Sequence, residues 1–337
     1  MSKVLVTGVG GFIASHLAER LMAQGHQVLG IDNLISGSLE NVPKEMQELG
    51  KFHQIELCNA IHVEKLVRKF KPDVIQHLAC YPYEGLSQFS PVKVADSVLM
   101  ASLNIFKSAV NNDVKRVVYY SSMARYGKGP VPCSEDTPRA PVDVYGAAKV
   151  AAEISLEAIS EATGLEYNIL VPHNVSGARM RLDDAYRGVL AIWVNTLMNG
   201  RAFHIFGDGE QRRAFSHVED VLQPCIEAGF SSEVKNEVIN IGALEAVTMN
   251  EAAKVLLKEF GSKLKPIYEP DRPCEVKDAF CTVEKSIELL GFKDEKTLVD
   301  IIKDIIEYAK LKGPQEFKYE DLEITKGAPK VWLEKRM

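Results

Sequence analysis

Residues 3–14 read KVLVTGVGGFIA, a short β-branched run that leads through glycines into an apolar helical pattern. Gly8, Gly11 and Ala14 form a Gly-x-x-Gly-x-x-Ala pattern, and small side chains at these positions let a strand-to-helix turn approach a phosphate closely. The helix that follows presents its first N–H groups and the positive end of its dipole to an anion. The stretch therefore predicts the first strand, the phosphate-binding turn and the first helix of a nucleotide-binding βαβ unit.

A carboxylate after the second apolar run decides between two interpretations of the glycine turn. Such a turn can be purely structural, because tight strand-to-helix connections also need glycine. Asp32, however, follows Gly8 by 24 residues, where its carboxylate can accept hydrogen bonds from both ribose hydroxyls of an adenosine. The same charge would repel a 2′-phosphate, so the two signals together favour NAD over NADP.

Short apolar runs alternate with longer helical patterns through the first half of the chain. The runs of strand length are 4–7, 28–31, 74–78, 117–120 and 169–171, with a later one at 238–241, and the helical patterns are 12–24, 63–70, 92–111 and 145–163. This alternation predicts an α/β fold, in which helices cover both faces of a Rossmann-type, doubly wound parallel sheet.

The alternation ends near residue 172, and the chain is long enough for a second, smaller unit. We expect residues 1–171 and about 221–245 to form a NAD-binding Rossmann domain. Residues 172–220 and 246–337 would form a smaller substrate-binding lobe, and residues 313–337 would be an extension that packs over the body or over a partner. Helices of the lobe are expected at 251–260, 283–290 and 296–310.

The composition of the 337 residues, 46% hydrophobic and 26% charged, is that of a globular protein with a sizeable core. No stretch has the roughly 18 unbroken apolar residues of a membrane helix, and the N-terminus has no secretory pattern. The net charge is −6 and no basic run is dense, which disfavours nucleic acid as a partner. We therefore expect neither a membrane nor a nucleic acid to be the partner.

The cysteines and histidines predict neither disulfides nor a metal site. The six cysteines are scattered without a Cys-x-x-Cys pair, which indicates reduced thiols and a cytoplasmic protein. The eight histidines lack the His-x-x-x-His spacing of a metal site.

Tyr145 and Lys149 open a long helical pattern and lie on the same face of that helix, one turn apart. An ammonium group near a phenol favours the phenolate, so it would bring the tyrosine pKa of about 10 toward the working pH. A phenolate in this state can take the proton of a sugar hydroxyl. A bare Tyr-x-x-x-Lys pair also occurs on helix surfaces, but Ser121 and Ser122 follow the run 117–120, at the sheet edge where ligands of such folds bind.

Together these motifs resemble the extended short-chain dehydrogenase/reductase family, and within it the nucleotide-sugar epimerases and dehydratases. The resemblance extends from residue 3 to about residue 292. It rests on residues 7–14, 32–34, 77–79, 121–122, 126–127, 145, 149, 207–211 and 272–273.

The resemblance implies a catalytic trio and a set of residues that contact NAD. Tyr145 would move the proton, Ser122 would bind the reacting sugar oxygen, and Lys149 would also hold the nicotinamide ribose. Glu56 stands where an aspartate commonly meets the adenine. The residues expected at the cofactor are Gly8, Gly11, Phe12, Ile13, Asp32, Asn33, Glu56, Leu57, Leu78, Ala79, Tyr145, Lys149 and Pro172.

The same resemblance implies a nucleotide-diphosphate sugar, most simply a UDP-sugar, as the substrate. Arg213 and Arg272 match positions that clamp the diphosphate, and guanidinium forks suit its oxygens. Asn174 matches a residue that touches the sugar and its phosphates. Ala279 would lie beside the C2 substituent, where a small side chain leaves room for an acetamido group. The residues expected at the substrate are Glu84, Met123, Asn174, Arg213, Ala279 and Arg272.

The residues after Ser122 bear on the reaction, whose first step in this family is oxidation at C4 of the sugar. Dehydratases that resemble this chain carry Asp-Glu directly after the matching serine, whereas Met123 and Ala124 cannot move protons. The sequence therefore favours a 4-epimerase of the UDP-glucose/UDP-galactose type, acting on these sugars or on N-acetylated or uronic relatives.

Two kinds of alternative remain open. Another enzyme could use the same 4-keto intermediate for dehydration with Glu84 as the acid, for decarboxylation of a uronic acid, or for net reduction. The protein could also be a non-catalytic, NAD-responsive binding protein on the same fold. In either case the resemblance implies a homodimer, because residues 92–111 and 145–163 match helices that form an intersubunit bundle in relatives.

Overall fold

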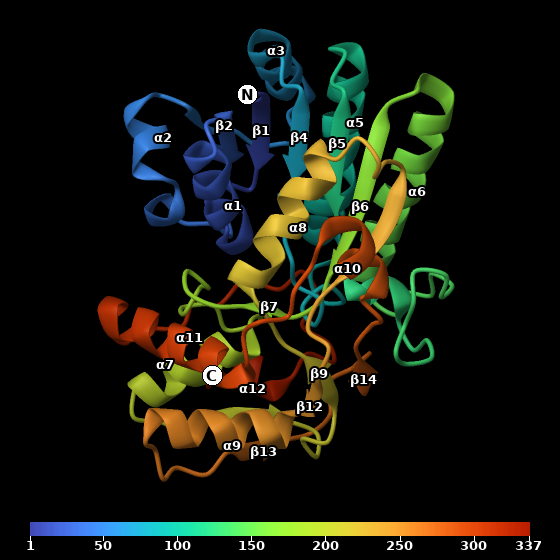
Figure 1. Cartoon of the computed structure of the whole chain (residues 1–337). Coiled ribbons are helices and arrows are strands. Elements are labelled where there is room, and N and C mark those ends of the chain that lie inside the picture. Colours follow the sequence, from blue (N-terminus) through green and yellow to red (C-terminus); the bar gives the residue numbers. More distant parts are fainter.

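The computed structural model describes all 337 residues, and a seven-stranded sheet forms its centre (Figure 1). The strand order is β11-β6-β5-β4-β1-β2-β3, and every neighbouring pair is parallel. The order reverses between β1 and β4, and ligands of open α/β sheets bind at such a reversal. The predicted doubly wound sheet is confirmed. Its strands are β1 (Lys3–Thr7), β2 (Gln27–Asp32), β3 (Phe52–Gln54), β4 (Val74–His77), β5 (Arg116–Tyr120), β6 (Glu166–Pro172) and β11 (Glu237–Ile241).

Helices cover both faces of this sheet, which explains why its strands read as continuous apolar runs. In β1, Val4 and Val6 pack into one hydrophobic core and Leu5 packs into the other. The first core is completed by α1 (Phe12–Ala23), α2 (Lys44–Glu48) and α8 (Val218–Phe230). The second is completed by α3 (Ala60–Phe70), α5 (Ala101–Asn111) and α6 (Val144–Thr163).

The helical pattern expected at 92–111 is interrupted in the structure. It consists of α4 (Pro91–Ala95), a π-helical turn η2 (Asp96–Met100) and then α5. In a π turn, the backbone hydrogen bonds join residues five apart instead of four. The spacing of apolar residues in the sequence does not reveal this change. The turn widens the helix where Asp96 and Ser97 reach a large cavity.

A smaller lobe lies beyond the carboxyl ends of the strands, at the bottom of Figure 1. Its core joins α7 (Val189–Met198), α9 (Met249–Phe260) and α11 (Leu298–Lys312). Short strand pairs complete it: β7 (Val175–Ser176) with β10 (Ser216–His217), β8 (His204–Phe206) with β13 (Ile267–Glu269), and β9 (Arg212–Ala214) with β12 (Ala246–Thr248) and β14 (Asp278–Ala279).

Three helices correct the expectations from the sequence. The pattern at 283–290 forms α10 (Glu284–Leu290), but α10 packs against α8 and β11 of the sheet rather than within the lobe. The helix α7 was not predicted, because it is mostly apolar and buried from Leu190 to Leu197, so its sequence shows no amphipathic stripe. The helix α8, which contains Pro224, was not predicted either.

The C-terminal extension packs over the body of the molecule. The Glu323 carboxylate accepts hydrogen bonds from the backbone N–H groups of Val92 and Lys93, both at 2.9 Å, at the start of α4. Trp332, on α12 (Lys330–Leu333), is 3% exposed and lies against Phe89 and Tyr186. Residues 313–337 were expected to pack over the body or over a partner, and in the structure they pack over the body.

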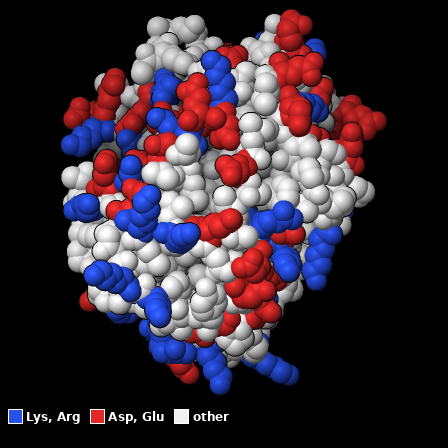
Figure 2. Space-filling model, turned by 60° about the horizontal axis from the view of Figure 1, so that its bottom comes forward, with Lys and Arg blue, Asp and Glu red and all other residues white.

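No helix has the length and apolar character that a membrane crossing requires. All six cysteines are free thiols. On the face shown in Figure 2, basic and acidic side chains are interspersed.

Candidate active site

A cavity of about 640 Å³ opens at the carboxyl edge of the sheet, where the lobe faces the strands. Every residue expected to contact the cofactor lines this cavity, from Gly8 in the first turn to Pro172 at the end of β6. Ser122, Glu84 and Asn174 line it as well. Parallel strands end at the same edge of a sheet, so residues distant in the sequence meet there.

The glycine turn between β1 and α1 forms a cradle with no room for side chains. Gly8 has a φ of +76°, and a Cβ at this position would lie 2.9 Å from the backbone N and Cα of Ala79. A Cβ on Gly11 would lie 2.9 Å from the Gly8 carbonyl oxygen. No side chain caps the N-terminus of α1, so its first N–H groups remain available to an anion.

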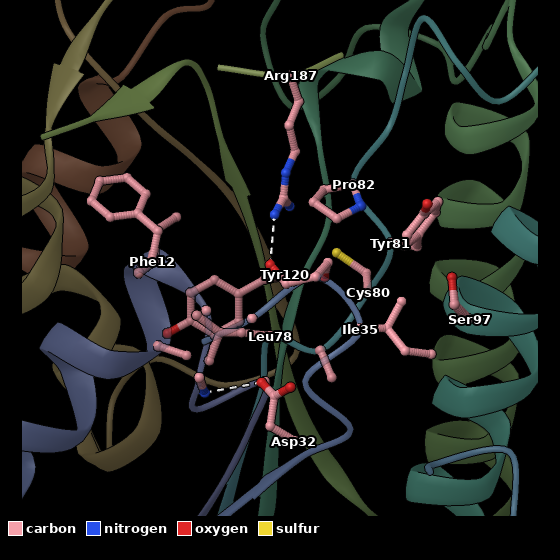
Figure 3. Close-up of a pocket in the computed structure, with 18 of the residues that line it drawn as sticks. Phe12, Asp32, Ile35, Leu78, Cys80, Tyr81, Pro82, Ser97, Tyr120 and Arg187 are labelled. Atoms are coloured by element: carbon pink, nitrogen blue, oxygen red, sulfur yellow. Dashed lines mark hydrogen bonds between the residues drawn. The ribbon is translucent and has the colours of Figure 1, made fainter. Parts of the chain in front are cut away.

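Asp32 is fixed at the end of β2 by two backbone hydrogen bonds. Its Oδ2 accepts from the Gly10 N–H at 2.9 Å (Figure 3), and its Oδ1 accepts from the Leu34 N–H at 2.6 Å. Burial raises the pKa of this carboxyl, and the hydrogen bonds from Leu34 and Gly10 oppose the rise. Asn33 donates to Glu56 at 2.8 Å, so the residues expected at the ribose and adenine are adjacent. The cradle and this carboxylate fit a dinucleotide without a 2′-phosphate.

The three residues of the predicted catalytic trio meet in the same cavity. Ser122 caps the 3₁₀ turn η3 (Met123–Tyr126), where its hydroxyl oxygen accepts from the Ala124 N–H at 3.2 Å, and its hydroxyl lies near Tyr145. Lys149 is buried, and its Nζ donates to the Tyr120 carbonyl at 2.6 Å. The same Nζ lies 5.8 Å from the centroid of the Tyr145 ring.

The pKa of Tyr145 differs from the expectation that Lys149 brings it toward neutrality. Burial raises this pKa well above the usual value, and the neighbouring Cys80 raises it further, whereas the nearby Ser122 hydroxyl lowers it. The ammonium of Lys149 is directed at a carbonyl oxygen rather than at the phenol. In this arrangement the loss of hydration therefore outweighs the charge of the lysine.

Two acidic residues that sequence reasoning missed hold the catalytic helix in place. Asp143 caps α6 by accepting from the Gly146 N–H at 2.7 Å. Burial and the charge of Glu84 raise the pKa of Asp143 to about 7.

Glu153 is fully buried one turn after Lys149 and accepts a hydrogen bond from Ser121. It also pairs with Arg125 at 3.3 Å and with Arg139 at 2.9 Å. The segment that carries Ser122 is thus tied to the helix that carries Tyr145 and Lys149. The spacing 145, 149, 153 on one helix face was the signal available in the sequence.

Glu84 has no ion-pair partner, and its side chain is open to the cavity. Protein nevertheless surrounds this carboxyl, and the resulting loss of hydration raises its pKa, while the charges of Arg213 and Arg272 oppose the rise. Glu84 also acts on the pKa of Tyr145, so it lies close to the catalytic trio.

The other expected substrate residues, Met123, Arg213, Arg272 and Ala279, do not line the cavity. Arg213 and Arg272 both bind Glu275, at 3.0 and 2.6 Å. Arg213 also donates to the carbonyl oxygens of residues 212, 276 and 277. Ala279 pairs with Arg213 between β14 and β9. Their roles at the substrate stay predictions.

A family model described as the NAD dependent epimerase/dehydratase family matches residues 4–242. The chain belongs to this family. The match confirms the resemblance to extended short-chain dehydrogenases/reductases, and NAD is the cofactor that the cradle and Asp32 fit.

Relatives of this family match nearly the whole chain. A UDP-glucose 4-epimerase of Mycolicibacterium smegmatis is 31% identical over 314 residues, which cover 92% of this chain and 99% of the relative. The structure of a UDP-glucose 4-epimerase from Thermotoga maritima with UDP-glucose has a TM-score of 0.87 at 30% identity, covering 92% of this chain and 99% of that one. The UDP-glucose 4-epimerase of Thermus thermophilus, solved with NAD, has a TM-score of 0.84 at 28% identity, covering 91% and 99%.

Proposed function

We propose that this protein is an NAD-dependent UDP-sugar 4-epimerase, which inverts C4 of its substrate through a transient 4-keto sugar. The observation that carries the proposal is the catalytic trio. Ser122, Tyr145 and Lys149 line the same cavity as the glycine cradle, and no acidic residue follows Ser122. The names of the relatives support the same reaction.

The chain's own residues handle the proton and the orientation of the sugar. Tyr145 takes the proton of the C4 hydroxyl and later returns it to the oxygen on the opposite face of the ring. Ser122, whose hydroxyl lies near Tyr145, binds the same oxygen. Lys149, anchored on the Tyr120 carbonyl, keeps a positive charge beside the phenol. Bound NAD supplies the acceptor of the C4 hydride and the donor that returns it.

A second candidate is another reaction from the same 4-keto sugar, and Glu84 is the observation that favours it. This carboxyl is open to the cavity, its pKa is raised, and it lies close to Tyr145. It could therefore donate a proton to a leaving hydroxyl, as a dehydratase requires.

The test is incubation of the purified protein with UDP-glucose, UDP-glucuronate and their N-acetylated counterparts, without added cofactor. The proposal expects the 4-epimer to form while NAD stays bound. A stable 4-keto product would indicate a dehydratase, and release of carbon dioxide from a uronate would indicate a decarboxylase. Bound NAD without any turnover would indicate a non-catalytic binding protein.

We also propose a homodimer formed through α4, α5 and α6. Val92 on α4 is 64% exposed, Met100 in the π-helical turn η2 between α4 and α5 is 47% exposed, and Ile154 on α6 is 51% exposed. Large apolar side chains with this exposure, gathered on neighbouring helices, are typical of protein interfaces. Sedimentation at micromolar concentration should give a dimer, and a monomer would contradict the proposal.

The location and the domain division are likewise proposals. The exposed thiols of Cys58 and Cys274 suit a reducing compartment, and we propose that the protein acts in the cytoplasm. We propose that residues 1–171 and about 221–245 serve NAD, while the lobe serves the nucleotide sugar.

A further inference from the structure

The loop between β7 and α7 brings three arginines, Arg179, Arg181 and Arg187, to the cavity, and none of them has a role in the mechanism above. Arg187 lines the cavity, and Figure 3 shows its side chain passing beside Pro82 and pointing into the cavity. No sequence motif marks this position. The side chain is 23% exposed, so it is held by protein but accessible from the cavity.

The protein fixes this guanidinium before any ligand arrives. Its Nε donates to Asp184 Oδ2 at 2.9 Å, and it lies 5.0 Å above the Tyr83 ring. Asp184 is itself buried, and it accepts hydrogen bonds from the Tyr83 hydroxyl at 2.5 Å and from the Tyr186 N–H at 2.9 Å. A guanidinium held in this way loses little freedom when it binds an anion.

Part of the guanidinium remains free for a ligand. Its Nη2 donates to the Ser36 carbonyl at 2.8 Å (Figure 3), while Nη1 makes no hydrogen bond within the chain. The charge of Arg187 lowers the pKa of Asp32, so the cation lies near the ribose end of the cofactor site. The unused N–H groups of a guanidinium fork are suited to phosphate oxygens.

The other arginines near the site are more fully engaged. Arg181, on the same loop, forks onto Asp183 at 2.9 and 3.2 Å. Arg179 binds Glu19 at 2.7 Å and Ser15 at 3.4 Å. Arg213 and Arg272 share Glu275.

We propose that Arg187 binds a diphosphate in the cavity and supplies the cation that the glycine turn and α1 lack. Two diphosphates enter this cavity, that of NAD and that of the nucleotide sugar. Binding of the NAD diphosphate depends only on NAD being the cofactor, whereas binding of the nucleotide-sugar diphosphate rests on the proposed function.

The test compares three variants of the holoenzyme. Arg187→Gln removes the charge but keeps an N–H donor at the position of Nε, which faces Asp184, and Arg187→Lys keeps the charge. Arg181→Gln is the matched control, because it removes an equal charge from the same loop. The rate at which bound NAD exchanges for labelled NAD measures how tightly the cofactor is held. Calorimetry with UDP and with uridine measures the affinity of the substrate site with and without the phosphates.

We expect Arg187→Gln to speed NAD exchange, or to weaken UDP but not uridine, by about 10- to 100-fold. Arg187→Lys and the control should stay within a few-fold of the parent. If only NAD exchange changes, Arg187 binds the diphosphate of the cofactor. If only UDP affinity changes, Arg187 binds the diphosphate of the sugar nucleotide.

Three results would overturn the proposal: no change in either readout, equal losses in Arg187→Gln and Arg187→Lys, or an equal loss in the control. In those cases the contact with Ser36 or the loop as a whole would be responsible. No readout depends on turnover, so a protein that binds both nucleotides but epimerises no sugar would refute the proposed function and leave this inference standing.

Discussion

The cofactor end of the site and its predicted substrate end are built in different ways. At the cofactor end, the backbone shapes the site. Gly8 has a positive φ, Gly11 lies against a carbonyl oxygen, and two backbone N–H groups hold Asp32. At the predicted substrate end, which lies beside the cavity and not in its lining, charged side chains bind one another, as Arg213 and Arg272 do through Glu275. Backbone geometry tolerates little change, whereas ion-paired side chains can exchange one partner for another. We therefore expect substitutions at the cofactor end to have severe effects on ligand binding, and substitutions at the predicted substrate end to have graded effects.

The largest expected effect lies where the two ends meet, at Tyr145. Tyr145→Phe removes the proton-transfer group and should lower turnover by about 10²–10⁴-fold, because general acid–base catalysis contributes that much. NAD should remain bound, since the cradle is untouched. Turnover and NAD content of the purified variant check both points, and near-normal turnover would remove Tyr145 from the mechanism.

A smaller but still large effect is expected from Gly8→Ala. The added methyl group would meet the Ala79 backbone at 2.9 Å at a positive φ, and a left-handed backbone costs alanine about 1–2 kcal/mol. The fraction of protein purified with NAD should fall by about tenfold or more. Gly50→Ala, at a positive φ with open space around it, is the matched control. Equal NAD content in the two variants would show that the cradle does not need glycine.

At the substrate end, Glu275→Gln should have a graded effect in the opposite direction. It removes the carboxylate that holds Arg213 and Arg272 and so frees both guanidiniums for a diphosphate. Affinity for UDP, measured by calorimetry, should rise by about 3- to 10-fold, while affinity for uridine should stay constant. A fall in UDP affinity would mean that Glu275 positions the arginines instead of competing with the ligand.

The smallest expected effect concerns the pH dependence of stability at Asp143. Its pKa is raised to about 7 in the folded protein, against about 3.9 in an unfolded chain. The folded state therefore binds the extra proton between about pH 4 and pH 7, and the contribution of this carboxyl to stability falls as the pH rises through that window.

Asp143→Asn keeps an oxygen to cap α6 but cannot ionise. Thermal unfolding should show the variant gaining stability relative to the parent from pH 5 to pH 8, whereas Asp136→Asn, at an exposed site, should follow the parent. A constant difference between Asp143→Asn and the parent across this range would contradict the raised pKa.

The sequence predicted the cofactor end because its signals are local. A glycine turn after β1 and a carboxylate at the end of β2 stand at fixed positions in a βαβ unit, and the parallel sheet brings Leu78, Ser122 and Pro172 to the same edge. The apolar runs located six of the seven strands of the main sheet, with ends that differ by at most three residues. Within that sheet only β3, with three residues and little apolar surface, was missed, and the short strands of the lobe were not predicted.

The substrate end could not be predicted in the same way, because its geometry depends on contacts between distant segments. No local pattern indicates that Glu275 engages both arginines, or that Asp184 and Tyr83 hold Arg187 in the cavity. The raised pKa of Tyr145 likewise reflects burial by several elements, which the spacing of Tyr145 and Lys149 alone does not reveal.

In the proposed reaction, C4 of a UDP-sugar gives up a hydride and its hydroxyl gives up a proton within this cavity, and both return to the sugar there. The most direct measurement uses UDP-glucose carrying deuterium at C4, incubated with the holoenzyme without added cofactor and followed by NMR and mass spectrometry. The account predicts UDP-galactose that retains the deuterium at C4, because the same hydride returns to the sugar. Loss of the deuterium from the product, or a product that keeps the original configuration at C4, would contradict it.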